Sequence, residues 1–194
     1  MPRKPEYDRD DLIARALDLF WKQGWAGTSL KDLEHVLKLK PGSFYAAFGS
    51  KDALFALTMD RYVQVGRARV ASMVEELGPL KTLQEFPLRM ISNTRAPAKA
   101  CMLAKSVLEL SGRDHALAAV ANAHLETMEK QFAQVFKEAQ SAGQIDAGLN
   151  PGALARRYQS DLMGLRISAE REGVDARAIA EEISESLSRL APPE

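Results

Sequence analysis

A short basic stretch in the first third of the chain carries the side chains best suited to bind an anion. From His35 to Lys51 the sequence has three lysines, Lys38, Lys40 and Lys51, and no aspartate or glutamate. Tyr45 lies among them, and a solvent-facing tyrosine hydroxyl donates well to a phosphate oxygen. Lysine charge is needed wherever a phosphate backbone comes close. The stretch therefore favours contact with nucleic acid.

Two short helices joined by a tight turn are predicted to position these side chains. Thr28 suits the N-cap of the first helix, and Pro41 suits the first turn of the second. A second helix of this kind fits a DNA major groove, which is about 12 Å wide. The sequence thus predicts a helix-turn-helix over about 28–48, although a three-helix packing unit with a solvated basic turn is the alternative. Apolar residues that can pack inward are Leu30, Leu33, Leu37, Leu39, Phe44 and Phe48.

Helical periodicity continues along the rest of the chain, which predicts an all-α fold. A three-helix N-terminal domain, 6–66, is expected to join a helical bundle, 67–194, through one long helix that starts after Ser50. Pro87 is expected to kink or split its helix. Further helices are predicted over about 8–23, 51–77, 80–93, 100–110, 114–142, 153–172 and 175–190.

Composition excludes several classes of protein. The 26 basic and 26 acidic residues cancel, so polyelectrolyte-like binding over the whole surface is not expected. One cysteine excludes an intrachain disulfide and a cysteine-based zinc site. The three histidines, His35, His115 and His124, have no ligand spacing, and there is no glycine-rich phosphate loop or nucleophile elbow. We expect no metal, no cofactor and no enzymatic activity.

The sequence also predicts where in the cell the protein is located. The first residues lack the apolar run of a signal peptide, and no window reaches the ~18–20 apolar residues that cross a bilayer. We therefore expect a cytoplasmic protein without membrane contact. A helical-bundle enzyme or a protein-binding adaptor is the alternative from another class, and neither would retain a specific DNA sequence.

The segment Gly42-Ser-Phe-Tyr-Ala-Ala-Phe-Gly-Ser-Lys-Asp-Ala-Leu-Phe55 resembles the core motif of the TetR/AcrR family of transcriptional regulators. The resemblance implies a homodimer on double-stranded operator DNA, with phosphate contacts from Thr28, Tyr45 and Lys51. The residues that it places at the turn and on the base-reading face are Lys38, Lys40, Pro41, Ser43 and Ala46.

Two positions depart from the family pattern. Lys38 stands where the family commonly has a turn glycine, and Lys40 where it has a capping serine or threonine. Loss of a capping oxygen costs ~1 kcal/mol, which Pro41 partly offsets because it removes one unpaired amide. Since Ala46 and Ala47 offer no hydrogen bonds, direct base contacts from them should be few and apolar.

The resemblance also implies an inducer pocket in the C-terminal part. Met and aromatic side chains suit an adaptable apolar cavity, although at helical spacing they also fill an ordinary core. The segment Ala100-Cys-Met-Leu to Glu109-Leu110 is similar to one branch of the family, in which some members sense electrophiles or oxidants through a cysteine. Lys99 and Lys105 would favour the thiolate of Cys101, and a buried, inert thiol is the alternative. Candidate pocket residues are Met59, Tyr62, Phe86, Met90, Cys101 and Met128.

Two apolar stripes near the C-terminus are predicted to form the dimer interface, unless both are buried within one chain. Pairing of these helices across a two-fold axis would make a four-helix bundle. The expected function is a repressor that a small-molecule or thiol-reactive inducer releases from its operator. The stripe residues are Leu154, Tyr158, Leu162 and Leu165, then Ile179, Ile183 and Leu187.

Overall fold

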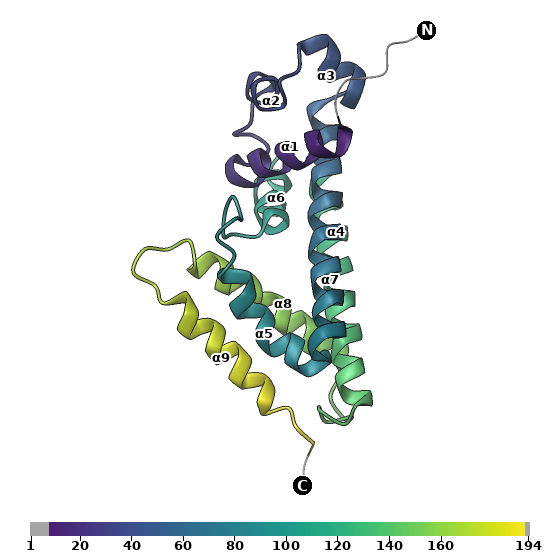
Figure 1. Cartoon of the computed structure of the whole chain (residues 1–194), viewed down its shortest axis with the longest axis vertical. Helices are drawn as coiled ribbons and strands as arrows, with labels where there is room; N and C mark the ends of the chain where they lie inside the picture. Colours follow the sequence, from purple (N-terminus) through teal and green to yellow (C-terminus); the bar gives the residue numbers. More distant parts are fainter. Residues whose placement is uncertain (1–7, 193–194) are drawn as a thin grey trace. The chain divides into compact units, whose positions relative to one another are not determined.

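The computed structural model describes residues 8–192, which form nine α-helices and no strand (Figure 1). This confirms the all-α prediction. Residues 6, 7, 193 and 194 of the two predicted domains lie outside the described residues. The helices are α1 (Arg9–Gln23), α2 (Leu30–Leu37), α3 (Pro41–Phe48), α4 (Lys51–Leu77), α5 (Pro79–Ile91), α6 (Met102–Ser111), α7 (Ala116–Ser141), α8 (Pro151–Ser168) and α9 (Ala176–Ser188).

Helix ends follow from polar caps in the local sequence. The Asp8 side chain accepts from the Asp10 N–H at the start of α1, and Ser50 Oγ accepts from the Ala53 N–H, 3.0 Å away, at the start of α4. Asn150 and Asp175 cap α8 and α9 in the same way. Each cap satisfies N–H groups that have no partner inside the helix.

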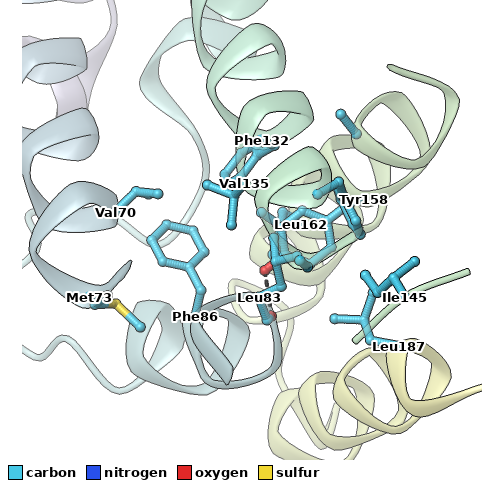
Figure 2. Packing of buried hydrophobic residues seen from close by; sticks show 13 residues of the cluster. Val70, Met73, Leu83, Phe86, Phe132, Val135, Ile145, Tyr158, Leu162 and Leu187 are labelled. Carbon is cyan, nitrogen blue, oxygen red and sulfur yellow. Dashed lines mark hydrogen bonds between the residues drawn. The ribbon is translucent and has the colours of Figure 1, made fainter. Parts of the chain in front are cut away.

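The helix α5 continues through Pro87, where a kink or break was expected. Proline has no N–H, so the carbonyl four residues earlier, that of Leu83, loses its helical partner. The hydroxyl of Tyr158 donates to that carbonyl over 2.7 Å (Figure 2). A buried phenol on α8 thus replaces the missing hydrogen bond, and burial raises the pKa of Tyr158 well above its ordinary value.

Close backbone contacts divide the chain into two compact units. Unit 1 runs to Gln64 and also contains Met102–His124, whereas unit 2 contains Val65–Cys101 and the chain from Leu125 onward. The helices α4 and α7 contribute residues to both units. The helix α6 therefore belongs to the same unit as the N-terminal helices, whereas the predicted boundary near residue 66 assigned it to the C-terminal domain.

Unit 1 buries one face of each of its first four helices. Phe20 of α1 meets Phe55 of α4 edge to face, with ring centroids 4.8 Å apart. Leu33 and Leu37 of α2 are buried, as are Phe44 and Phe48 of α3. The helix α2 packs against α1, and because Phe44 and Phe48 face inward, the opposite face of α3 is left to solvent.

Unit 2 has an aromatic core. Phe132 of α7 packs edge to face against Phe86 of α5 and Tyr158 of α8 (Figure 2). Leu162 and Leu187 complete the same cluster from α8 and α9. Among the described residues, no helix combines the length and apolarity needed to cross a membrane.

Candidate nucleic-acid interface

The helix α3 divides into a buried and an exposed face. Phe44 is fully buried and Phe48 nearly so, and both lie on the inward side. Tyr45 is 49% exposed, and its ring packs edge-on against Phe44, with centroids 5.5 Å apart. Ser43 and Ala46 are exposed beside it. The exposed face can therefore enter a groove while the phenylalanines hold the helix in place.

The turn before α3 has an unusual backbone. Lys38 ends α2 in the left-handed region, at φ 55°, and its N–H donates to the carbonyls of Glu34 and His35. Lys40 precedes Pro41 and gives α3 no side-chain cap. Lys38, Lys40 and Pro41 are exposed, so both ammonium groups face solvent near the start of α3.

Ser29, and not Thr28, caps α2. The Asp32 N–H donates to Ser29 Oγ over 3.2 Å, and the Ser29 N–H donates to Asp32 Oδ2 over 2.8 Å. Hydrogen bonds from the Ser29 side chain, then from its backbone, lower the pKa of Asp32. The predicted cap was wrong by one residue, because serine and threonine at adjacent positions carry the same signal.

Thr28 is buried, and its hydroxyl donates to the Gly24 carbonyl over 2.7 Å. Its side chain therefore closes the α1–α2 connection from inside. The hydroxyl that was expected to contact phosphate is therefore buried, whereas the neighbouring Ser29 is exposed.

Lys51 closes the same connection from α4. Its ammonium donates to the carbonyls of Trp25 and Thr28 over 2.8 and 3.0 Å and lies 4.0 Å from the Trp25 ring centroid. Burial lowers the pKa of Lys51, although Asp52 and Glu109 act in the opposite direction. Two of the three donors of the ammonium group are therefore used within the chain.

Arg15 on α1 binds the end of α2, a role that no local sequence pattern indicates. Its Nη1 donates to the Val36 carbonyl over 3.0 Å, and its Nη2 pairs with Asp11 over 3.1 Å. The bond satisfies a carbonyl in the last turn of α2. It thus fixes the turn that carries Lys38.

Two side chains of α6 form hydrogen bonds with the backbone at the end of α1, and no local sequence pattern indicates these contacts. The carboxylate of Glu109 accepts from the N–H groups of Trp25 and Ala26, over 2.9 and 2.7 Å. Lys105 donates to the Trp21 carbonyl over 2.8 Å. Gly24 has φ 80°, a backbone conformation that favours glycine, and a Cβ there would lie 2.9 Å from Glu109 Oε2, so the carboxylate would have to shift.

The predicted pocket residues are divided between the two units. In unit 1, Met59 is fully buried and Tyr62 packs edge-on against Trp21. In unit 2, Phe86 is a core residue, and Met90 and Met128 pack against that core while partly exposed.

Cys101 is half-buried and directly precedes α6. The two lysines expected to favour its thiolate have other partners. Lys99 donates to the carbonyls of Ile91 and Asn93, and Lys105 to those at the end of α1. Both ammonium groups thus bind backbone carbonyls at helix ends.

Four of the predicted interface residues are core residues of unit 2. Tyr158, Leu162, Leu165 and Leu187 are buried within the single chain. The stripe expected at a dimer interface is largely used inside one chain, because α8 packs against α5 and α9. Partial exposure remains at Leu154, Ile179 and Ile183.

Two of the three histidines each lie beside one carboxylate. His115 Nε2 lies 3.4 Å from Asp52 Oδ2, and His124 Nε2 lies 3.0 Å from Asp60 Oδ1. Within residues 8–192, no three His, Cys, Asp or Glu side chains are grouped so as to hold a metal ion.

Two sequence families match the chain. Residues 12–58 match the family described as bacterial regulatory proteins, tetR family, and residues 79–179 match the tetracyclin repressor-like C-terminal domain. The first match spans α1–α3 and the start of α4, and the second runs from the start of α5 into α9. The exposed face of α3 thus lies within the first matched region.

Three similar proteins match over nearly their whole length. The HTH-type transcriptional repressor ComR of Escherichia coli (strain K12) is 27% identical over 195 residues, 98% of this chain and 91% of ComR. A TetR family regulator from Cytophaga hutchinsonii has a TM-score of 0.84 at 19% identity and 96% coverage of both chains. A cysteine mutant of CifR, solved with 26-base-pair operator DNA, has a TM-score of 0.79 at 26% identity, covering 98% of this chain and 100% of CifR.

Proposed function

Because the chain belongs to the TetR family of bacterial regulatory proteins, we propose that it is a transcriptional repressor that holds operator DNA through the exposed face of α3. It is a DNA-binding transcriptional regulator and not an enzyme. The observation that supports DNA contact through α3 is the exposed Tyr45 on a helix whose phenylalanines are buried, beside two exposed lysines. The repressor assignment is supported by the similarity to the repressor ComR.

The proposed contacts divide into phosphate anchors and base readers. Tyr45 and the backbone amides at the start of α4 are the anchors. Lys40, Ser43 and Ala46 face the bases, where a lysine can bond guanine and an alanine can touch a thymine methyl. Lys38 and Pro41 set the turn.

We further propose that the repressor is a homodimer. Two half-sites about 34 Å apart require two recognition helices related by a two-fold axis. The exposed face of α8 supports this contact, because Ile167 is 50% exposed and Gly164 leaves open space. Since its proposed partner is operator DNA, we place the protein in the cytoplasm.

Release from DNA is proposed to follow binding of a small molecule beside Phe86, Met90 and Met128 in unit 2. A coupling free energy of ~1–3 kcal/mol between ligand and DNA makes a useful switch. Modification of Cys101 is a second proposed trigger. It is supported by the position of Cys101 directly before α6, the helix whose Glu109 binds the backbone at the end of α1. If Cys101→Ser responds to thiol-reactive compounds as the wild type does, this second trigger is excluded.

The repressor assignment is tested in cells. Chromatin immunoprecipitation would identify the bound promoters, and their transcripts would be compared with and without the gene for this chain. We expect transcripts from bound promoters to rise on deletion, and wild-type protein but not Tyr45→Ala to restore repression. Transcripts that fall on deletion would identify an activator instead.

A further inference from the structure

A half-buried arginine in unit 2 has no carboxylate partner among residues 8–192. Arg69 of α4 donates from Nη2 to the Arg89 carbonyl over 2.6 Å and forms no ion pair with any described aspartate or glutamate. A guanidinium has five N–H donors in a planar fork, and one carbonyl occupies only part of it. The remaining donors are available to a ligand.

The charges around Arg69 are positive. Burial lowers the pKa of Arg69, and repulsion from Arg89 and Arg166 lowers it further. The nearby acids serve other groups: Glu76 and Glu85 pair with Arg89 over 3.4 and 2.8 Å. Glu170 accepts from the N–H groups of Lys99 and Ala100, while Arg166 donates to the carbonyls of the same two residues.

An aromatic ring lies beside the same guanidinium, and a methionine lies beside the preceding turn of α4. The Arg69 Cζ lies 5.9 Å from the centroid of the Phe86 ring. Gly66 lies one turn before Arg69 on α4, and a Cβ there would meet Met128 Cε at 3.7 Å and Sδ at 3.9 Å. Methionine has three rotatable bonds and fills gaps adaptably, so this side chain can move for a bound molecule.

From this juxtaposition we propose that unit 2 binds an organic carboxylate with an apolar body. The Arg69 fork holds the carboxylate, and Phe86 and Met128 contact the body. Arginine matches a carboxylate bidentately, with hydrogen bonds about twice as strong as neutral ones. The proposal rests on the proposed function, because it names the chemical class of the inducer. The alternative is that Arg69 only caps the end of α5 and binds no ligand.

Calorimetric titration of the full chain without DNA tests the ligand class. The probes are benzoate and hexanoate, each compared with its neutral counterpart, benzamide or hexanamide. We expect each acid to bind roughly tenfold or more tightly than its amide, because hydrogen bonds to charged groups contribute more than neutral ones. Acids that bind no more tightly than the amides, or no binding by either acid, would overturn the proposal without any variant.

Variants then assign the effect to one side chain. Arg69→Met should remove the preference for the acid, and Arg69→Lys, which keeps the charge but not the fork, should reduce it. Arg171→Met, which removes an exposed arginine in the loop after α8, is the control and should change nothing. A preference retained in both Arg69 variants would contradict the proposal. Retention of a duplex selected from random DNA is measured separately, so loss of DNA binding would count against the repressor assignment alone.

Discussion

At the scale of single residues, Tyr45 combines a fixed ring with a free hydroxyl. Its ring packs against Phe44, so the hydroxyl is positioned without an added loss of rotamer entropy on binding. Replacement by phenylalanine removes one hydrogen-bond donor and retains the ring. The substitution therefore isolates the phosphate contact.

We expect Tyr45→Phe to weaken binding to operator and to random duplex alike, by roughly 3- to 10-fold, since a net hydrogen bond contributes about 1 kcal/mol. Fluorescence anisotropy with both duplexes measures this, and thermal unfolding should be unchanged. A loss confined to operator DNA would make Tyr45 a base reader.

Lys51 is expected to affect stability more than salt dependence. Lys51→Met removes two hydrogen bonds to carbonyls and the contact with the Trp25 ring, which should lower the free energy of unfolding by about 1–3 kcal/mol. Urea denaturation measures it, with the exposed Lys130→Met as control. The slope of log affinity against log salt should stay unchanged; a flatter slope would show that the ammonium reaches phosphate after all.

At the scale of helices, polar caps at both ends of α2 determine where the recognition unit begins. The lowered pKa of Asp32 means that folding favours its charged form, so its contribution is present above the ordinary carboxyl pKa, ~3.9, and is lost as pH falls through its lower value in the folded protein.

We expect Ser29→Ala to destabilise the protein by about 1 kcal/mol at neutral pH, because α2 loses its capping box. Since that loss also returns the Asp32 pKa towards its ordinary value, the difference from wild type should shrink below pH ~4. Denaturation at several pH values measures this. A difference that stays constant down to pH 3 would contradict the role of the Asp32 charge.

The hydroxyl of Tyr158 is expected to matter only while Pro87 is present. Tyr158→Phe leaves the buried Leu83 carbonyl unpaired, at a cost of about 1–3 kcal/mol. Pro87→Ala restores an N–H four residues after Leu83, so the same substitution should cost less in that background. A double-mutant cycle by urea denaturation measures the coupling. Equal costs in both backgrounds would show that the two residues act independently.

The local parts of this structure were predictable, and the long-range parts were not. Asp8, Ser50 and Asp175 cap helices a few residues away, so their roles follow from neighbouring positions. The bond from Glu109 to the α1–α2 connection spans 83 residues of sequence, and no local pattern points to it. Tyr158 looked like an interface residue because apolar periodicity does not distinguish a core from a second chain.

At the scale of the whole molecule, the exposed face of α8 is expected to pair two chains. Ile167→Glu places a charge on that face and should convert the dimer to monomer at micromolar concentration, with operator affinity falling at least 10-fold because one half-site is lost. Analytical ultracentrifugation measures the mass, and Ser72→Glu, at an exposed position of α4, is the control. An unchanged dimer mass would place the interface elsewhere.

Selection of bound duplexes from a random DNA pool tests the central claim most directly, that the exposed face of α3 reads sequence in the major groove. We predict enrichment of an inverted repeat whose half-sites lie about one helical turn, ~10 base pairs, or a multiple of it, apart. The same selection with Ser43→Ala or Lys40→Ala should enrich a repeat altered at particular base pairs. A pool that remains unenriched with the wild-type protein would contradict the claim.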